Sequence, residues 1–322
     1  MLVKYFVRGG CLIMKILLFT HKNDIDGIGN VILSKLSFES VDYVLCGTFD
    51  INNKVKEYID KKIIYNYEKV FITDLCLNEE LLLEINNDNN LKDKIQILDH
   101  HKTYENEKYT KYSFVKVQIK DSNGLCCGTS LFYEYLVENN YLTKSDVINE
   151  FVELTRQHDT WEWKNIYNNE KARELAILFD ALGIDGYISF IYEKLLKEKV
   201  FIFNNIESVL INNKKIQIND AIEEYVKNIH YRDILDLRAG IIFIDYQYRN
   251  EIAEYLRENK FDMDFVMMIS LDRSVVSYRS VKENVSVRKV AEYFGGKGHD
   301  VAATNPIVET DKEKIIDILT NE

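Results

Sequence analysis

The stretch Lys15–Asp26, KILLFTHKNDID, decides the fold that the sequence predicts. Its first half, Lys15–Thr20, is a short apolar run that ends in polar residues, which is typical of a buried strand in a parallel sheet. Its second half places one histidine and two aspartates directly after this strand. Because ligands of parallel sheets bind at the carboxyl ends of the strands, we expect a ligand site to begin at His21.

Short apolar runs and helical patterns alternate after this stretch. The expected strands are Val41–Cys46, Lys69–Thr73, Ile95–Leu98 and Phe114–Ile119. The expected helices are Gly27–Leu36, Ile51–Lys61, Asn78–Ile85, Gly128–Leu136 and Ser145–Arg156. Strands that alternate with helices predict an α/β domain built on a parallel sheet.

The composition along the chain predicts three parts. Residues 14–164 form the parallel-sheet domain, and residues 165–236 form a mostly helical connector that is rich in Asn, Lys and Glu. A smaller α/β domain covers residues 237–322 and ends in a glycine-rich loop. Its expected elements are a strand at Ala239–Asp245, a helix near Glu251–Glu258, strands at Phe265–Ser270 and Ser274–Arg279, and a helix around Ser286–Phe294.

The bulk composition is that of a soluble globular protein. Of the 322 residues, 46% are hydrophobic and 29% are charged, and the formal net charge is −11. A protein that grips long duplex nucleic acid usually has a basic face, which these totals do not indicate. The charge therefore favours small anionic substrates at a confined site.

The cysteines and the apolar runs predict a cytoplasmic protein without a membrane partner. No apolar run approaches the roughly 18 residues that span a bilayer. The five cysteines have neither zinc-site spacing nor an even disulfide framework, so we expect reduced, buried thiols. They are Cys11, Cys46, Cys76, Cys126 and Cys127.

Histidines and aspartates cluster at the ends of three predicted strands. One such pair is usually a surface or core feature, but repetition at three strand ends favours a shared crevice. Carboxylates in one crevice repel each other unless their pKa values rise or cations bind them. Carboxylate and imidazole together suit Mn²⁺, Mg²⁺ or Zn²⁺, and this many ligands can hold two metals. The aspartates are Asp24, Asp26, Asp74, Asp99 and Asp159.

The order of these clusters resembles the four motifs of the DHH-family phosphoesterases. The matching residues are Asp24-Ile25-Asp26-Gly27, Asp74, Asp99-His100-His101 and His158-Asp159-Thr160-Trp161. Near the C-terminus, Gly295-Gly296-Lys297-Gly298-His299 with Ala302-Ala303 resembles the glycine-rich signature of the DHH-associated C-terminal domain. The five motifs span nearly the whole chain. Within the family, it looks most like the stand-alone nanoRNases (oligoribonucleases) and nucleotide phosphatases.

The resemblance implies a role for each matching residue at a pair of divalent ions, Mn²⁺ first and Mg²⁺ or Co²⁺ next. His21 and Asp24 would bind the first ion, and Asp74 would bridge both. The second ion would be bound by Asp26, His100 and Asp159. Asp99 would orient His100, and His101 would face the scissile phosphate as a hydrogen-bond donor or general acid.

Substrate contacts are expected in the C-terminal domain. Small residues let backbone N–H groups approach an anion closely, and cationic side chains add charge-assisted hydrogen bonds. The candidates are Arg279, Arg288, Gly295, Gly296, Lys297, Gly298 and His299. Lys297 and Thr304 stand where the family often has glycine. Trp161 and Trp163 have two interpretations, stacking on a base or packing in the core.

The expected reaction is hydrolysis of a phosphate ester by a hydroxide that two metals generate from water. Short oligoribonucleotides (nanoRNA) come first as substrates, followed by nucleoside bisphosphates such as 3′-phosphoadenosine 5′-phosphate and by cyclic mono- or dinucleotides. Longer single strands are less favoured, and the glycine-rich motif disfavours a pyrophosphatase. The alternative outside enzymes is a nucleotide sensor. A homodimer is left open.

Overall fold

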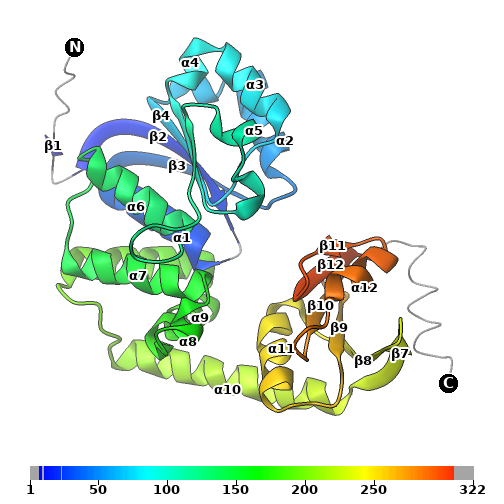
Figure 1. Cartoon of the computed structure of the whole chain (residues 1–322). Coiled ribbons are helices and arrows are strands. Elements are labelled where there is room, and N and C mark those ends of the chain that lie inside the picture. The colour runs from blue at the N-terminus through cyan, green and yellow to red at the C-terminus, as the bar shows by residue number, and fades with distance from the viewer. Residues whose placement is uncertain (1–6, 9–10, 23, 308–322) are drawn as a thin grey trace. The chain divides into compact units, whose positions relative to one another are not determined.

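The computed structural model describes residues 7–8, 11–22 and 24–307 of the chain. The chain folds into two compact units, Met1–Ile211 (unit 1) and Asn212–Glu322 (unit 2). Each unit has its own sheet (Figure 1).

A parallel sheet forms the centre of unit 1. Its described strands follow the order β3-β2-β4-β5-β6, and every neighbouring pair in this order is parallel. The short β1, which the sequence did not predict, pairs antiparallel with the start of β2. The strands are β1 (Val7–Arg8), β2 (Cys11–His21), β3 (Phe38–Cys46), β4 (Lys69–Thr73), β5 (Ile95–Asp99) and β6 (Val115–Val117). The predicted α/β fold class is confirmed.

Helices cover both faces of this sheet. Helices α1 and α6 pack on one face, and α7 packs against both of them. Helices α2 and α3 pack on the other face, where they share a core cluster with the strands. The helices are α1 (Ile25–Ser37), α2 (Ile51–Asp60), α3 (Glu79–Asn87), α4 (Asn89–Lys92), α5 (Glu107–Thr110), α6 (Gly128–Glu138) and α7 (Asp146–Asp159), with 3₁₀ turns at Ile64–Asn66 and Lys102–Tyr104.

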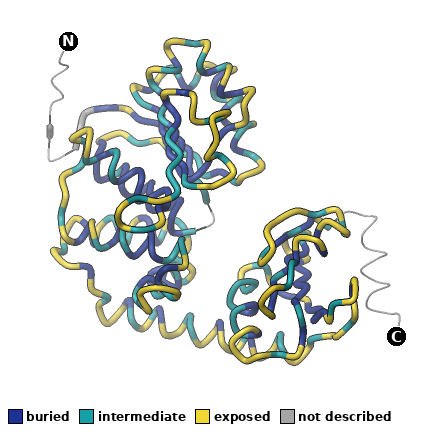
Figure 2. Tube along the Cα trace, viewed as in Figure 1, coloured by how far each residue is buried: buried dark blue, intermediate teal, exposed yellow. Residues whose placement is uncertain are grey.

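Apolar side chains on both faces of the strands build the core of unit 1. Figure 2 shows the central strands β4 and β5 as mostly buried tube, while the outer faces of the helices are exposed. Phe71 of β4 is fully buried and contacts Phe132 and Tyr135 of α6. The described cysteine side chains are buried and unpaired, as we expected; they are Cys46, Cys76, Cys126 and Cys127, and the side chain of Cys11 lies outside the described residues.

The register of the central strands places their carboxyl ends side by side. Thr73 of β4 pairs with Thr20 of β2 on one side and with Leu98 of β5 on the other. The residue after each of these positions is polar, and Asp74 donates its backbone N–H to the Leu98 carbonyl oxygen at 3.0 Å. The sheet therefore delivers His21, Asp74 and Asp99 to one edge.

Two further helices of unit 1 follow α7. They are α8 (Glu162–Asn165) and α9 (Glu170–Lys197). By length and composition α9 could cross a membrane, because one 18-residue window has a mean hydropathy of 1.5, so the expectation that no run approaches this length was wrong. Asp180 and Asp185 interrupt the run in the sequence, which hides it. The helix is broken at Gly183 and packs against α1 and α7, so it is weak evidence for a membrane span, and the absence of a membrane partner stays a prediction.

Unit 2 contains a mixed sheet with the described strand order β11-β12-β10-β9-β8-β7. The pair β8–β9 is parallel, and its other neighbouring pairs are antiparallel. The strands are β7 (His230–Ile234), β8 (Leu237–Phe243), β9 (Phe265–Ser270), β10 (Val275–Ser280), β11 (Lys297–Gly298) and β12 (Ala302–Pro306). The helices are α10 (Asn205–Lys227), which begins in unit 1, α11 (Arg249–Glu258) and α12 (Val287–Tyr293), with a 3₁₀ turn at Tyr246–Tyr248.

The stretch 165–236, which we expected to be a helical connector, contains more than helices. Strand β7 lies in it and pairs with β8 through a two-residue turn at Leu235 and Asp236. Both turn residues have positive φ angles, 52° and 62°, which suit a tight hairpin. The boundary between the two units also falls inside this stretch, after Ile211. The three-part division at residues 164 and 236 stays a prediction.

Replacing Phe71 with alanine should destabilise unit 1 strongly. The change leaves a cavity between the sheet and α6, and such truncations cost about 3–5 kcal/mol. Leu83→Ala is the matched control, because Leu83 of α3 is 52% exposed and should change the free energy of unfolding by less than about 0.5 kcal/mol. Urea denaturation of the two variants tests this, and equal midpoints would contradict the placement of Phe71.

Candidate metal centre

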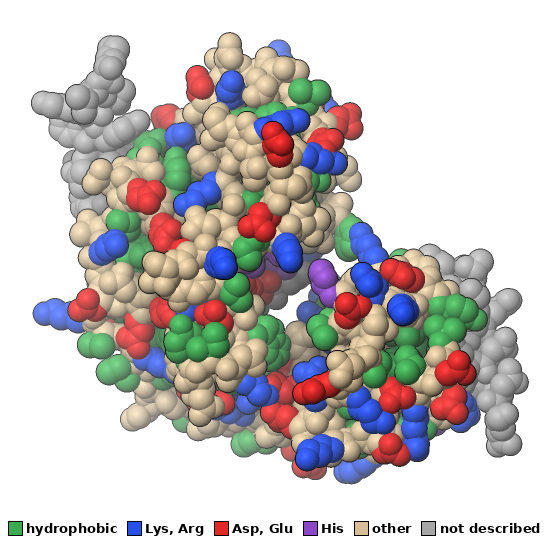
Figure 3. Space-filling view, in the orientation of Figure 1, with side chains coloured by type: hydrophobic (Ala, Val, Ile, Leu, Met, Phe, Trp, Pro, Cys, Tyr) green, Lys and Arg blue, Asp and Glu red, His purple; other side chains and the backbone are tan. Residues whose placement is uncertain are grey.

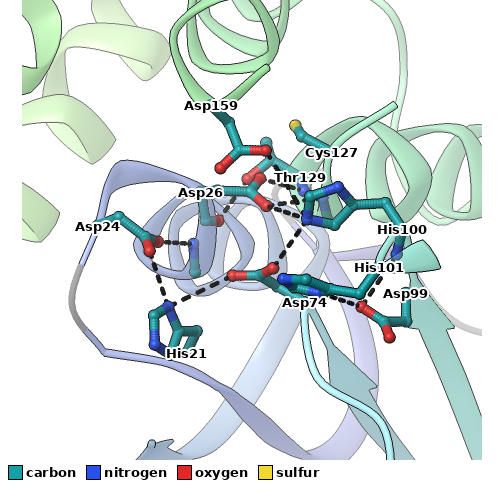
Figure 4. A network of polar contacts seen from close by, with 12 residues as sticks. His21, Asp24, Asp26, Asp74, Asp99, His100, His101, Cys127, Thr129 and Asp159 are labelled. Atoms are coloured by element: carbon teal, nitrogen blue, oxygen red, sulfur yellow. Dashed lines mark hydrogen bonds and ion pairs between the residues drawn. The ribbon is translucent and has the colours of Figure 1, made fainter. Parts of the chain in front are cut away.

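The polar site lies at the carboxyl edge of the parallel sheet in unit 1. Figure 4 shows side chains from the ends of β2 and β5, the loop after β4 and the start of α1 turned toward one another, joined by one from the end of α7. The first and last of these side chains are far apart in the sequence, at positions 21 and 159. The site includes all six of the predicted metal ligands: His21, Asp24, Asp26, Asp74, His100 and Asp159.

The first group of ligand atoms belongs to His21, Asp24 and Asp74. One ligand atom from each lies within 4.8 Å of the others. The Nδ1 atom of His21 is 2.7 Å from Asp24 Oδ2 and 3.7 Å from Asp74 Oδ2. Two carboxylates and an imidazole at these distances form a ligand set for a divalent cation.

The second group belongs to Asp26, His100 and Asp159, whose ligand atoms also lie within 4.8 Å of one another. The Nε2 atom of His100 is 3.8 Å from Asp26 Oδ2 and 3.7 Å from Asp159 Oδ2. The same nitrogen is 3.1 Å from Asp74 Oδ1. This group therefore shares Asp74 with the first.

Asp74 has the geometry of a bridging ligand. Its Oδ2 faces His21 and its Oδ1 faces His100, so one carboxylate reaches both groups (Figure 4). Its φ angle is 58°, in the left-handed region that few residues other than glycine adopt. Backbone strain of this kind persists where the surrounding structure enforces it, often at functional sites.

The loop between β2 and α1 holds Asp24 in place. Asp24 caps α1, because its Oδ1 accepts the Gly27 N–H at 2.9 Å while its Oδ2 faces His21. A Cβ at Gly27 would lie 2.0 Å from the carbonyl oxygen of His21, so the turn requires glycine. Asn23, at the middle of this loop, lies outside the described residues.

Asp26 is held by the N-terminus of α6, a partner that the sequence did not reveal. Its Oδ2 accepts the Gly128 N–H at 2.7 Å, and its Oδ1 accepts the Thr129 N–H at 2.6 Å. The N–H groups at the start of a helix carry partial positive charge, so they are suitable partners for a carboxylate and fix the position of Asp26. A Cβ at Gly128 would lie 2.5 Å from Asp74 Cβ, so the glycine also leaves room for the bridge. The small residues at the start of α6 are the feature of the sequence from which this close contact could have been inferred.

The carboxylate of Asp99 contacts the ring of His101, a contact that we did not expect. Its Oδ1 lies 2.8 Å from His101 Nδ1 and accepts the backbone N–H of His100 at 2.9 Å. The Nε2 atom of His100 turns toward Asp74, and the expected role of Asp99 in orienting the His100 ring stays a prediction. Asp99 is fully buried and His101 is half exposed, so the pair presents the His101 ring at the surface of the site.

The close approach of charged groups shifts the pKa values of the site residues. Burial, followed by the negative charge of Asp26, raises the pKa of Asp74 well above its usual range and that of Asp159 to about 7. Burial alone would lower the pKa of His100, but the charges of Asp159 and Asp26 raise it. The centre thus takes up protons to offset carboxylate repulsion, and divalent cations would fill the same need.

His101 is set up to carry a proton. Burial lowers the pKa of its ring, whereas the hydrogen bond and the charge of Asp99 raise it, and the net shift is upward. A contact at Nδ1 leaves Nε2 for a second partner. The ring can therefore donate from Nε2 when it is protonated.

The glycine-rich segment forms a tight hairpin in unit 2. Strand β11 pairs with β12, and the His299 N–H donates to the Ala302 carbonyl oxygen at 2.8 Å. A Cβ at Gly296 would lie 2.5 Å from the Thr304 carbonyl oxygen, and one at Gly298 would lie 2.4 Å from Ala303 Cα. Gly295 has a φ of 79°. Lys297 and His299 are exposed on this hairpin.

The two candidate arginines differ in their surroundings. Arg288 lies 3.5 Å from Asp300 and so has an acidic partner. Arg279 donates to the Asn250 side chain at 3.1 Å, and among the described residues it forms no ion pair. Burial, and then the charge of Arg249, lowers the pKa of Arg279 to about 10. A largely buried guanidinium without a carboxylate suits an anionic ligand.

Without divalent cations, the free energy of unfolding should fall as the pH rises from roughly 6 to 8. Asp74 and Asp159 have raised pKa values, so the folded state binds more protons than the unfolded state until these groups ionise, and stability is lost as they do. Mn²⁺ at 100 times its Kd should restore about 2.7 kcal/mol at pH 8. Thermal melts in EDTA and in Mn²⁺ measure both effects. In EDTA, Asp159→Asn should flatten the pH dependence, and a slope unchanged in this variant would contradict the assignment.

Comparisons with known proteins agree with this geometry. No family model matches the chain. Oligoribonuclease NrnB of Bacillus subtilis is 30% identical over 288 residues, which cover 89% of this chain and 71% of that protein. The pGpG-specific phosphodiesterase PggH of Vibrio cholerae has a similar fold, with a TM-score of 0.55 at 12% identity over 95% of this chain and 97% of that one.

A second solved structure shares the fold. The DHH domain of a member of a family of ribosomal proteins has a TM-score of 0.56 at 13% identity, covering 94% of this chain and 85% of that one. The ordered motifs, the gathered ligands and the extent of the similarity to oligoribonuclease NrnB lead to one conclusion: the chain belongs to the DHH family of phosphoesterases.

Proposed function

We propose that this chain is a metal-dependent phosphoesterase that hydrolyses short oligoribonucleotides. The observation that carries the proposal is the position of Asp74 between two groups of ligands, with one carboxylate oxygen facing each. The relative named as an oligoribonuclease supports the substrate class. The same centre could act on cyclic dinucleotides or on 3′-phosphoadenosine 5′-phosphate, which stay alternatives.

The residues fit two divalent cations, with Mn²⁺ as the first choice. His21, Asp24 and Asp74 would hold one, and Asp74 with Asp26, His100 and Asp159 would hold the other. When bound, such a pair supplies a nucleophile at neutral pH and neutralises charge on the phosphate. Without cations, burial and repulsion between carboxylates raise the pKa values of Asp74 and Asp159. Bound cations would remove this repulsion.

His101 and Asp99 would handle the proton of the leaving group. Asp99 is fully buried and holds Nδ1 of His101, so it fixes the direction of the ring. The raised pKa of His101 keeps its ring protonated for longer as the pH rises. From Nε2 the ring can donate a proton to the oxygen that departs from phosphorus.

Unit 2 would bind the nucleotide that carries the terminal phosphate. Arg279 offers a cation without an acidic partner among the described residues, and the glycine-rich hairpin exposes the side chains of Lys297 and His299. Figure 3 shows Lys and Arg side chains interspersed with Asp and Glu over the visible face of the protein. Long nucleic acids need many phosphate contacts in a basic track, so this mixture of charges supports short substrates.

A panel of substrates tests the proposal directly. Purified protein with Mn²⁺ is given a 5′-labelled RNA dinucleotide, a 24-mer RNA, 3′-phosphoadenosine 5′-phosphate and a cyclic dinucleotide, each with and without EDTA. We expect EDTA-sensitive release of mononucleotides, far faster from the dinucleotide than from the 24-mer. Turnover confined to the bisphosphate or the cyclic substrate would show that this compound, and not short RNA, is the substrate. No turnover with metal bound would favour the nucleotide sensor.

Asp74→Ala should abolish this turnover, because both groups of ligands lose their shared carboxylate. We expect a fall in kcat of at least about 10²–10³-fold, the size of effect that follows the loss of a single catalytic contact. Asp60→Ala is the matched control, since Asp60 is exposed on α2 and pairs with Lys56, away from both groups of ligands. Retained turnover in Asp74→Ala, with metal still bound, would contradict the bridging role.

The cellular setting is also a proposal. The cytoplasmic location and the choice of Mn²⁺ over Mg²⁺ or Co²⁺ stay predictions. A homodimer is likewise untested.

A further inference from the structure

The turn between α7 and α8 carries an exposed aromatic side chain shortly after a proposed metal ligand. Asp159 is the last residue of α7, and α8 begins at Glu162. Trp161 lies between them, two residues from a proposed ligand. Its side chain is 41% exposed.

The two tryptophans of the chain have different surroundings. Trp163 is buried, so packing in the core accounts for it. The same explanation does not fit Trp161, whose indole reaches the solvent. The two rings are 6.2 Å apart between centroids, with an interplanar angle of 35°. Trp163 therefore supports one side of Trp161 and leaves part of its ring open.

The backbone at Trp161 is strained. Its φ and ψ angles are 61° and 8°, in the left-handed region. The position after a helix that takes this conformation is usually glycine, sometimes asparagine, because a Cβ is unfavourable there. A bulky side chain at such a position is an outlier that needs an explanation. If the residue at position 161 served only to stabilise the turn, glycine would be more favourable than tryptophan.

Surrounding contacts hold this turn in place. The Trp161 N–H donates to the His158 carbonyl oxygen at 3.1 Å. The next residue, Glu162, is buried, forms an ion pair with Arg156 and accepts the Leu125 N–H at 3.2 Å. Burial of Glu162 and Trp163 on the following turn leaves Trp161 facing outward. The backbone that carries the exposed indole is therefore fixed by its neighbours.

We propose that Trp161 is the surface on which a base of the substrate stacks while its phosphate lies at the metal centre. The inference rests on the proposed function, since it names the base subsite of that reaction. Asp159 Oδ2 is 3.7 Å from His100 Nε2, so the tryptophan follows directly on the metal ligands. A base is separated from its own phosphate by one sugar, so its subsite must lie near the ligands, and Trp161 is two residues from Asp159. Stacking tolerates every base, so the subsite selects nucleotides over other phosphate esters without reading their sequence.

Kinetics on two substrates test the subsite. One is an RNA dinucleotide, and the other is a dinucleotide of the same backbone that lacks both bases. For Trp161→Leu we expect the KM for the RNA dinucleotide to rise about 5- to 100-fold, the range for loss of one base stack. The abasic substrate should change little, and Trp161→Phe should retain most of the wild-type KM. An unchanged KM, or an equal loss on both substrates, would overturn the proposal.

Thermal stability separates stacking from a structural role. Trp161→Gly places the residue that favours the left-handed conformation at this turn, so its melting temperature should equal or exceed that of the wild type. Its KM for the RNA dinucleotide should still rise as in Trp161→Leu. A variant that loses stability and whose kinetic loss is the same on both substrates would show that Trp161 only supports the fold.

Fluorescence tests the contact without turnover. Trp163→Phe leaves Trp161 as the only tryptophan, because the chain has two. In Mg²⁺, adenosine 5′-monophosphate should quench this fluorescence, whereas ribose 5-phosphate, which has no base, should not. No quenching at concentrations that saturate binding would overturn the proposal. This result does not depend on hydrolysis, so it remains informative if the wild type cleaves no RNA and the proposed function fails.

Discussion

Repulsion among carboxylates that are gathered at one edge of a sheet is the constraint on which this structure depends. Asp24, Asp26, Asp74 and Asp159 meet within a few ångströms, largely out of water, and burial with mutual repulsion raises the pKa values of Asp74 and Asp159. The protein stabilises the other two locally, since Asp24 caps α1 and Asp26 accepts two N–H groups at the start of α6. A cluster that is costly when empty and built for ligands is what a pair of divalent cations requires.

The fold supplies this arrangement through register and strain. Parallel pairing of β2, β4 and β5 aligns their last residues, so polar side chains placed just after each strand meet at one edge. The left-handed backbone at Asp74 turns its carboxylate toward both groups, and the same conformation at Trp161 leaves an indole exposed next to the last ligand. Both residues lie where surrounding hydrogen bonds fix the backbone, which is how a folded protein maintains strain at a site.

Much of this could be predicted from the sequence, because short-range signals carry it. Apolar runs located the central strands, with β4 and β9 correct to the residue, and the polar residues after them located the ligands. The contacts that support the ligands from distant parts of the sequence could not be predicted. Asp26 and Gly128 are 102 positions apart, and no local pattern marks their hydrogen bond. The choice of Asp99 between adjacent histidines depends on ring orientation, and β7 was missed because its hairpin turn, Leu235-Asp236, lacks the usual glycine.

Crystals soaked in Mn²⁺ and measured at the manganese absorption edge test the central claim most directly. The account predicts two anomalous peaks in unit 1, one beside His21 and Asp24 and one beside His100 and Asp159, with Asp74 contacting both. A single peak, or peaks that Asp74 does not touch, would contradict the two-metal centre on which the proposed reaction is built.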